Sequence, residues 1–166
     1  MNRSGISFLA LLIASGAEAA LAPAVRDGKC PREGAGWVVS SLSRPYSIDY
    51  LDCEDDPSHH RIELWSARRL LDTLDVTLEE GEVLVGGVGH HTDGCSKSPD
   101  QGFLDSVIAV ASTSEGVVPW RECDQLMTSV KRLWEIDEET GTLREIDPAG
   151  FSCAFANDEG CGPPGG

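Results

Sequence analysis

Residues 104–112, Leu-Asp-Ser-Val-Ile-Ala-Val-Ala-Ser, predict a β-strand at the centre of a sheet. The run from 107 to 111 is apolar at every position, whereas a strand with one solvated face alternates apolar and polar residues. The segment is therefore apolar enough to be a central strand of a mainly β chain.

Further β signals lie on both sides of this strand. Residues 82–88, Glu-Val-Leu-Val-Gly-Gly-Val, predict a strand entered through Glu80-Gly81, and residues 36–42, Gly-Trp-Val-Val-Ser-Ser-Leu, predict the first strand. Residues 132–147 predict a hairpin in which Gly141 adopts the positive φ that a bulged turn needs. The apolar residues that face each other across this turn are Leu133, Trp134 and Ile136 on one strand and Leu143 and Ile146 on the other.

Two segments are ambiguous on their own residues. In residues 61–74, apolar positions 64, 67, 71 and 74 form a helical stripe, and Asp56-Pro57 would be an acceptable helix start. A strand there is supported only by the alternation of Ile62 and Leu64, which Trp65 breaks, so local signals favour a helix narrowly. Residues 123–130 are compatible with a short helix or with a further strand.

Residues 1–19 predict a secretory signal peptide. Arg3 supplies a positive charge, residues 6–14 form an apolar region interrupted only by Ser7, and Ala17-Glu-Ala19 places small residues where a signal peptidase cuts. The apolar segment is far shorter than the roughly 20 residues that a spanning helix needs. We expect a secreted or periplasmic protein without membrane insertion after cleavage. Residues 20–156 would form a single domain, and residues 157–166 a flexible tail rich in Gly and Pro.

The charge restricts the classes of partner. The formal net charge is -15 and no segment is rich in Lys or Arg, so nucleic acid and anionic lipid surfaces would be repelled. Solubility is the simplest explanation of the acidity itself. We therefore exclude nucleic acid and expect an unknown protein or small ligand as the partner.

The cysteines indicate an oxidising compartment. All six follow the predicted cleavage site, namely Cys30, Cys53, Cys95, Cys123, Cys153 and Cys161. An even number in an exported chain predicts three disulfides, whose connectivity the sequence leaves open. A thiolate metal site would need close CxxC-type pairs, and the chain has none. Cys153 and Cys161 lie in a Gly-rich tail, where a small local loop would close easily.

The order of cysteines and strands between residues 30 and 130 follows a recurring pattern. Its elements are Cys30, Ala35-Gly-Trp-Val-Val39, Arg61-Ile-Glu-Leu64 with Arg68-Arg-Leu-Leu71, residues 82–88, Cys95, Phe103 with residues 107–111, and Cys123. This order resembles that of exported bacterial proteins with a netrin-like OB barrel, the fold shared with tissue inhibitors of metalloproteinases. The resemblance favours a strand over a helix at 61–71.

The resemblance also implies the fold class and one disulfide. We expect a mainly β protein, a small OB-like barrel with one or two short helices, an extra C-terminal β-hairpin and three disulfides. The expected pairs are Cys95–Cys123 from the resemblance, Cys153–Cys161 from the short loop, and Cys30–Cys53 as the pair left over. The inhibitors of this fold chelate a catalytic zinc through an N-terminal cysteine. Cys30 lies inside the predicted mature chain, so that chemistry is not carried over.

All four histidines occur as two adjacent pairs, His59-His60 and His90-His91. If residues 61–69 and 81–89 formed an antiparallel hairpin, His60 would lie opposite His90 at its open end. Three or four imidazoles could then reach one ion, and imidazole suits Zn, Cu or Ni.

Acidic residues near the histidines could serve as further ligands or as acceptors behind them, and these are Asp55, Asp56 and Asp93. The alternative is that the histidines are simply solvated. Adjacent residues on a strand point to opposite faces, so each pair would offer one nitrogen, and a helix at 61–74 would remove the site.

Catalytic motifs are missing from the sequence. GxSxG, HExxH, a phosphate loop and SxxK do not occur, and oxidised cysteines leave no thiolate nucleophile. Acidic pairs are abundant, but in a chain this acidic they are typical of solvated loops. The four tryptophans occur in apolar contexts, which favours a place in the core for Trp37, Trp65, Trp120 and Trp134.

These observations lead to an exported, non-catalytic binding or interaction module, with no catalytic residue and no certain cofactor. The first alternative is a transition-metal-binding protein that holds Zn or Cu through His59, His60, His90 and His91. The second is a hydrolase with a carboxylate site.

Overall fold

The computed structural model describes residues 30, 36–54, 56–86, 94–120 and 124–155. These residues form twelve strands: β1 (Gly36–Val39), β2 (Tyr46–Asp52), β3 (His59–Ser66), β4 (Arg69–Thr77), β5 (Glu82–Gly86), β6 (Gly94–Ser96), β7 (Val107–Ser112), β8 (Val117–Pro119), β9 (Gln125–Met127), β10 (Val130–Asp137), β11 (Thr142–Ile146) and β12 (Ser152–Phe155). Their helical content is a single 3-10 turn, Pro99–Gln101. The mainly β class is therefore confirmed, whereas the expected short helices are not found in the described ranges.

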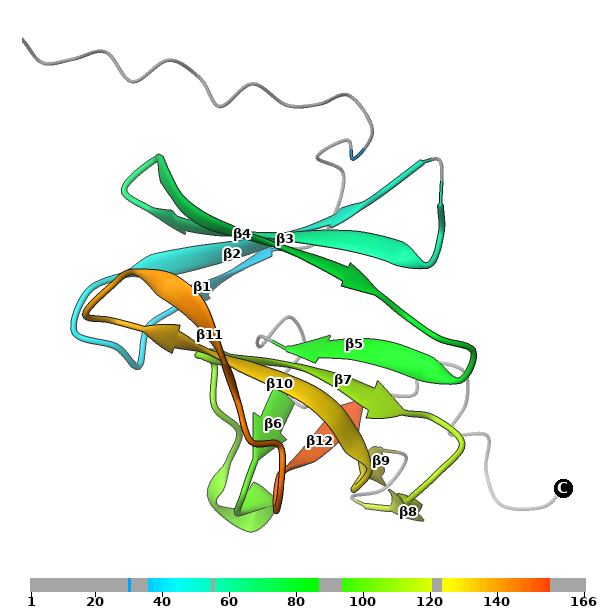
Figure 1. Ribbon diagram of the computed structural model, residues 1–166. Coiled ribbons are helices and arrows are strands. Elements are labelled where there is room, and N and C mark those ends of the chain that lie inside the picture. Colours follow the sequence, from blue (N-terminus) through cyan, green and yellow to red (C-terminus); the bar gives the residue numbers. More distant parts are fainter. Residues whose placement is uncertain (1–29, 31–35, 55, 87–93, 121–123, 156–166) are drawn as a thin grey trace, which may run out of the picture.

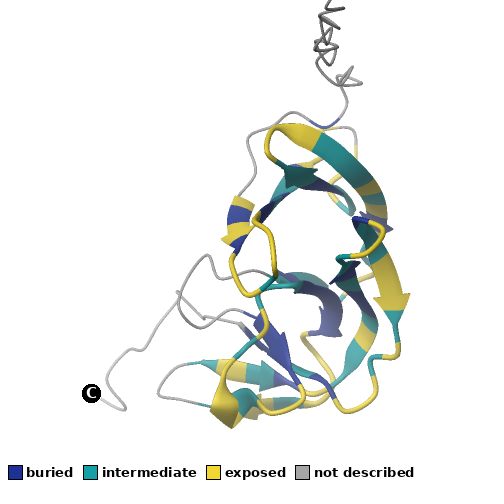
Figure 2. Cartoon of the chain, turned by 90° about the vertical axis from the view of Figure 1, so that its left-hand side faces the viewer, coloured by how far each residue is buried: buried dark blue, intermediate teal, exposed yellow. Residues whose placement is uncertain are grey.

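The strands form three antiparallel sheets that lie in layers (Figure 1). The N-terminal sheet has the order β1-β2-β3-β4, the central sheet β11-β10-β7-β5, and the small sheet β6-β12-β9-β8. The central sheet lies between the other two and can therefore bury both of its faces. Buried residues line the space between the layers, and exposed residues lie on the outer strands and loops (Figure 2).

Strand β7 confirms the central strand expected at residues 104–112. All six of its residues are buried, and it pairs with β10 on one side and β5 on the other. Ile108 and Val110 face the N-terminal sheet, while Val107, Ala109 and Ala111 face the small sheet. The run is apolar at every position because each face of the strand meets a hydrophobic layer.

Two hydrophobic clusters hold the three layers together. The first, between the N-terminal and central sheets, is made of Trp37, Val39, Tyr46, Ile48, Ile62, Leu64, Val76, Ile108, Val110, Trp134 and Ile136. The second, between the central and small sheets, is made of Val85, Cys95, Val107, Ala109, Ala111, Met127, Leu133, Phe151 and Cys153. Full burial of a large aliphatic side chain contributes about 1.5–3 kcal/mol. Burial of these side chains thus contributes most of the free energy that holds the three sheets together.

The hairpin expected at 132–147 is present as β10 and β11. Leu133 pairs with Ile146 and Ile136 pairs with Leu143, as the apolar pattern predicts, whereas Trp134 lies opposite Glu145. Gly141 has a φ of 70°, and its N–H donates to the carbonyl of Asp137. Gly141 therefore has the positive φ that was expected of it in this turn.

Residues 61–74 belong to strands β3 and β4 and the turn between them, so the strand expected at 61–71 is confirmed and the helix favoured by local signals alone is wrong. Ile62 and Leu64 on β3 are fully buried in the first cluster. Trp65 breaks the apolar alternation because it lies on the outer face beside Glu63, whose carboxylate accepts a hydrogen bond from Nε1 of Trp65, while the pairing of β3 with β2 continues without a shift. A bulge at Leu71 on β4 shifts the register of the β3–β4 pair. Ala67, which completed the apparent helical stripe, is exposed in the turn that follows β3.

Other elements differ from expectation at their ends. Strand β1 stops at Val39 rather than at position 42, because the N–H groups of Ser40 and Ser41 donate to the carboxylate of Asp105 instead of to β2. Strand β5 ends at Gly86, and the rest of the expected strand lies outside the described residues. The segment 123–130 contributes strand β9, and Cys123 is not among the described positions.

The expected OB-like barrel is not found, because the sheets stay open. Strands β4 and β11 belong to different sheets. The backbone N–H of Leu143 on β11 donates to Oδ2 of Asp72 on β4 at 2.8 Å, so a side chain takes the bond that a backbone ladder would use. The two sheets are thus joined at this edge without closing into a barrel.

Two disulfides join described cysteines. Cys30–Cys53 is confirmed, with an S–S distance of 2.04 Å. The expected pairs Cys95–Cys123 and Cys153–Cys161 are wrong, because Cys95 is bonded to Cys153. These two residues lie directly opposite each other on β6 and β12, a pairing that brings together positions 58 residues apart in the chain.

Candidate functional site

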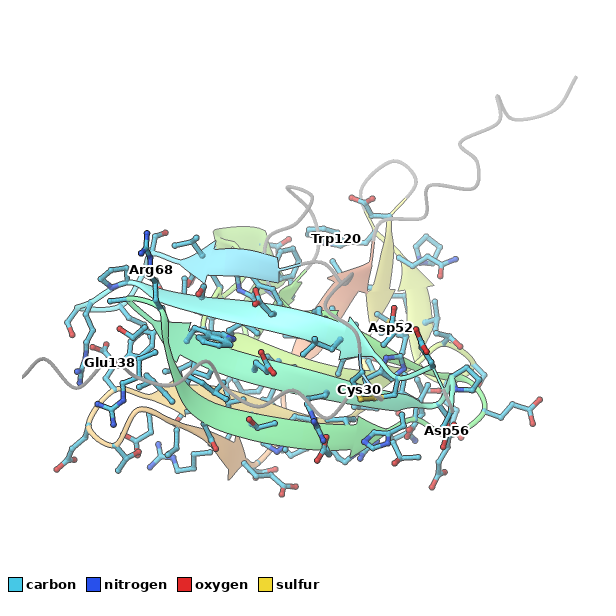
Figure 3. All side chains as sticks on the ribbon, turned by 90° about the horizontal axis from the view of Figure 1, so that it is seen from above. Cys30, Asp52, Asp56, Arg68, Trp120 and Glu138 are labelled. Carbon is cyan, nitrogen blue, oxygen red and sulfur yellow. A yellow bond between two sulfur atoms is a disulfide. The ribbon has the colours of Figure 1, made fainter. Side chains whose placement is uncertain are left out.

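The N-terminal sheet has two chemically different ends (Figure 3). Asp52 and Asp56 lie at one end, and Arg68 and Glu138 lie at the other. We name the first the histidine end (residues 52–54, 56–61 and 75) and the second the loop end (residues 40–45, 66–69 and 138–141). Strand β3 connects them, since it begins at His59 and ends at Ser66.

At the histidine end, His60 is paired with an acidic residue on the neighbouring strand. His60 and Asp52 lie opposite each other on β3 and β2, and Nδ1 of His60 is 2.9 Å from Oδ1 of Asp52. The imidazole is largely covered, with 18% of its side chain exposed, whereas the carboxylate is 83% exposed. The carboxylate therefore orients the ring from the solvent side.

His59 belongs to a second charged group. Its Nε2 is 3.4 Å from Oδ1 of Asp75, and the same oxygen accepts a hydrogen bond from Nε of Arg61 at 2.9 Å. The bond from Arg61 lowers the pKa of Asp75 against the opposing effect of partial burial. In the preceding loop, the hydroxyl and then the N–H of Ser58 lower the pKa of Asp56. These carboxylates are held ionised.

The strand pairing that motivated the metal site is wrong. Strand β3 pairs with β2 and β4, and β5 pairs with β7, so His60 lies opposite Asp52 and Val76. His90 and His91 lie outside the described residues, as do Asp55 and Asp93. Within the described part of the chain, no group of three His, Cys, Asp or Glu side chains could hold a metal. Metal binding by the four histidines stays a prediction.

Two carboxylates that the sequence did not single out lie on the outer face of the N-terminal sheet. Glu63 on β3 is 8% exposed and accepts a hydrogen bond from Nε1 of Trp65 at 3.0 Å. Asp49 lies directly opposite on β2. Among the described residues, the carboxylates whose pKa is displaced are displaced downward, namely Asp56, Asp75, Asp105, Glu115 and Asp137. A general acid would need displacement in the opposite direction.

At the loop end, Asp105 fixes the loop between β1 and β2. Its Oδ2 accepts hydrogen bonds from the backbone N–H of Ser40 at 2.8 Å and of Ser41 at 3.2 Å, and both hydroxyls donate to the same carboxylate. Partial burial raises the pKa of Asp105, but the bonds from Ser41 and Ser40 outweigh it, so the pKa lies below its ordinary value. Nε1 of Trp37 donates to the carbonyl of Asp105 at 2.9 Å.

Glu138 joins the same loop to the turn between β10 and β11. Its carboxylate accepts bonds from the N–H of Ser43 at 3.1 Å and from the hydroxyl of Ser43. Its carbonyl accepts a bond from Arg44 at 2.6 Å. Within the turn, the N–H groups of Thr140 and Glu139 lower the pKa of Asp137. Loops from two different sheets are thus tied to one another.

The third loop is the tight turn between β3 and β4. Ser66 pairs with Arg69, so Ala67 and Arg68 form a two-residue connection. Their φ angles are 47° and 73°, the left-handed pattern of a type I′ turn that Asn and Gly usually occupy. The hydroxyl of Ser66 lies 3.4 Å from the carbonyl of Pro45, which places the turn beside the β1–β2 loop.

The tryptophans are divided between core and surface. Trp37 and Trp134 are buried in the first cluster, as expected. Trp65 and Trp120 are only partly buried, and the ring of Trp120 contacts that of Phe103 edge-on, with centroids 5.2 Å apart. The expected core position is therefore confirmed for two of the four.

Comparisons with known proteins found no match: no family model, no curated protein and no solved structure is similar to this chain. The resemblance to netrin-like domains therefore stays a prediction. Among the described residues, no helix has the length and apolar character needed to span a membrane.

Proposed function

We propose that the chain is an exported, non-catalytic binding module that holds a partner at its loop end. The observation that carries this proposal is the anchoring of three adjacent loops from two sheets. Carboxylates of Asp105 and Glu138 bind backbone N–H groups of the β1–β2 loop, and Ser66 contacts the same loop from the β3–β4 turn. Loops held on a rigid scaffold are the usual carriers of recognition.

The anchoring reduces the conformational cost of binding. Ordering a free loop on association costs about 0.5–1.5 kcal/mol for each immobilised side chain, so loops ordered beforehand bind more tightly. Charged acceptors make stronger hydrogen bonds than neutral ones, and four such bonds converge on Asp105 alone. The loop end is thus pre-organised in the free protein.

Export is supported by the two disulfides. Disulfides persist in oxidising compartments and are rare in the cytosol, so Cys30–Cys53 and Cys95–Cys153 favour a periplasmic or extracellular location. Residues 1–19 lie outside the described residues, and we propose that they are a signal peptide. The lowered pKa values of Asp75 and Asp105 leave both residues poor proton donors, which disfavours them as the general acid of a hydrolase.

Site-specific photo-crosslinking tests the binding role. A photoreactive phenylalanine analogue would replace Ala67 at the loop end, and the same analogue would replace Ala149 in a separate variant. Both alanines are exposed in turns, but Ala149 precedes β12 and lies outside the loop end. Each variant is irradiated in an extracytoplasmic extract of the source cells.

The proposal predicts a discrete adduct of higher mass at position 67 and none at position 149. Competition with unlabelled protein should remove the adduct, because a specific surface saturates. Equal adducts at both positions, or none at position 67, would contradict a binding role for the loop end.

Metal binding is the second candidate, and the pairing of His60 with Asp52 favours it. A carboxylate that holds one ring nitrogen commonly accompanies a histidine that ligates a metal through the other. Calorimetric titration with zinc should then show binding that the His60→Ala variant loses. Identical titrations of the two proteins would exclude His60 as a ligand.

A further inference from the structure

We infer that the β3–β4 turn binds a short carboxylate-rich segment of a protein partner through Arg68 and Arg69, an inference that rests on the proposed binding role of the loop end. The first support is the distribution of positive charge. The other described cations each have a partner: Arg61 with Asp75, Lys131 with Glu115, Arg132 with Glu82, Arg144 with Glu135, Arg44 with the carbonyl of Glu138, and Lys97 with the ring of Phe151.

Arg68 and Arg69 differ from these residues. Both are exposed, and neither forms an ion pair with any carboxylate in the described part of the chain. The formal net charge is -15, so acidic groups are abundant, and two adjacent cations that meet no carboxylate among the described residues are unusual. Their guanidinium groups are available to an external anion.

The backbone presents this pair in a fixed position. In the described ranges, two non-glycine residues have a positive φ, and these are Ala67 and Arg68. The left-handed region is unfavourable for both, and strained backbone persists mainly where the surroundings hold it in place and function uses it. The pairing of Ser66 with Arg69 closes the turn tightly. The arginines therefore project from a rigid hairpin and not from a free loop.

The chemistry of the pair suits a carboxylate ligand. Guanidinium donates two parallel hydrogen bonds to one carboxylate, and this geometry adds specificity to the charge attraction. The adjoining turn carries Asp137, Glu138 and Glu139, and their charges limit how far an anionic ligand can extend. An extended polyanion would meet this acidic surface, whereas a short acidic segment need contact only the tip. At physiological salt, screening within about 8 Å confines the interaction to such near neighbours.

Binding of a defined probe tests the inference. The probe is a short fluorescein-labelled polyglutamate peptide, and its anisotropy is measured against the mature protein at low and at physiological salt. The test variant is Arg68→Asn with Arg69→Gln, because Asn tolerates the left-handed conformation and keeps the turn. The matched control is Lys97→Gln with Lys131→Gln, which removes the same charge from exposed positions outside the loop end.

The peptide should bind the wild type and the control alike. The Arg68/Arg69 variant should bind roughly tenfold or more weakly, as expected for the loss of charge-assisted contacts. Replacing both arginines by lysine should give intermediate affinity, since the charge stays but the planar fork is lost. Urea unfolding of each variant verifies that the fold is intact.

Three results would overturn the inference: equal weakening in the control, no binding by the wild type, or tighter binding of a heparin fragment than of the peptide. The last result would assign the site to a sulfated polyanion. Crosslinking at Ala67 separates this inference from the proposed function. An adduct at position 67 without peptide binding would leave the loop end as the binding surface and reject only the acidic partner.

Discussion

Replacing Ala67 by Gly should stabilise the protein, although glycine ordinarily destabilises a folded chain. Ala67 has a φ of 47°, and a left-handed conformation costs an L-residue roughly 1–2 kcal/mol. Glycine removes that cost but loses about 0.4–1 kcal/mol because the unfolded chain becomes freer. The side chain of Ala67 is exposed, so no packing is lost. The balance is a gain of about 0.8 kcal/mol in the free energy of unfolding.

Ala149 supplies the matched control. It is an exposed alanine in a turn, and its φ is not positive. Ala149→Gly should therefore lower the free energy of unfolding by about 0.4–1 kcal/mol. Urea unfolding with intact disulfides, followed by tryptophan fluorescence, measures both variants. If Ala67→Gly destabilised the protein as much as Ala149→Gly does, the turn would carry no strain and the reasoning from its backbone would be refuted.

Further predictions concern the disulfides, the core and the loop anchor. Peptide mapping without reduction should recover a Cys123–Cys161 disulfide, because the other four of the six cysteines are already paired; a free thiol at either position would contradict this. Leu133→Ala should lower the free energy of unfolding by about 2–5 kcal/mol, whereas Leu104→Ala, at a residue 44% exposed, should stay within about 0.5 kcal/mol; similar losses would contradict the layered core. The pKa of Asp105 lies below its ordinary value of 3.8, so its ionised form contributes stability above that pH, and the contribution is lost as pH falls through the lowered value. Asp105→Asn should lower the free energy of unfolding at neutral pH and should make that free energy fall less steeply as the pH becomes acidic. An acid unfolding curve identical to that of the wild type would contradict the anchoring role.

The elements that can be predicted from the sequence are those whose pattern of apolar and turn residues is set by neighbouring positions in the chain. The apolar run at 107–111 reflects two covered faces, and β7 has them. The hairpin of β10 and β11 follows from facing apolar residues and from Gly141, whose φ of 70° a glycine adopts without strain. In both cases a few neighbouring residues carry the whole signal.

Predictions from the sequence fail where residues far apart in the chain decide the structure. Cys95 bonds Cys153 because β6 and β12 pair, a contact between strands 58 residues apart that spacing in the chain cannot reveal. The turn at Ala67 and Arg68 lacks the Asn or Gly that ordinarily signals a hairpin, so the segment resembled a helix.

The candidate site was also missed, because its anchors are non-local. Asp105 contacts Ser40 across 65 residues, and Glu138 contacts Ser43 across 95 residues. Arg68 and Arg69 are visible in the sequence as adjacent cations in an acidic chain, but only the structure shows that neither forms an ion pair with a described carboxylate. The first histidine pair, His59-His60, begins β3 and so lies at the opposite end of the sheet from these anchors.

Chemical-shift mapping compares the two ends of the N-terminal sheet directly. Isotope-labelled mature protein would be titrated with the polyglutamate peptide, and the backbone amide and arginine Nε–H signals followed. We predict perturbations confined to residues 40–45, 66–69 and 138–141, with the largest changes at the side chains of Arg68 and Arg69. Perturbations centred on His59 and His60, or spread over the small sheet, would contradict the assignment of the loop end as the binding surface.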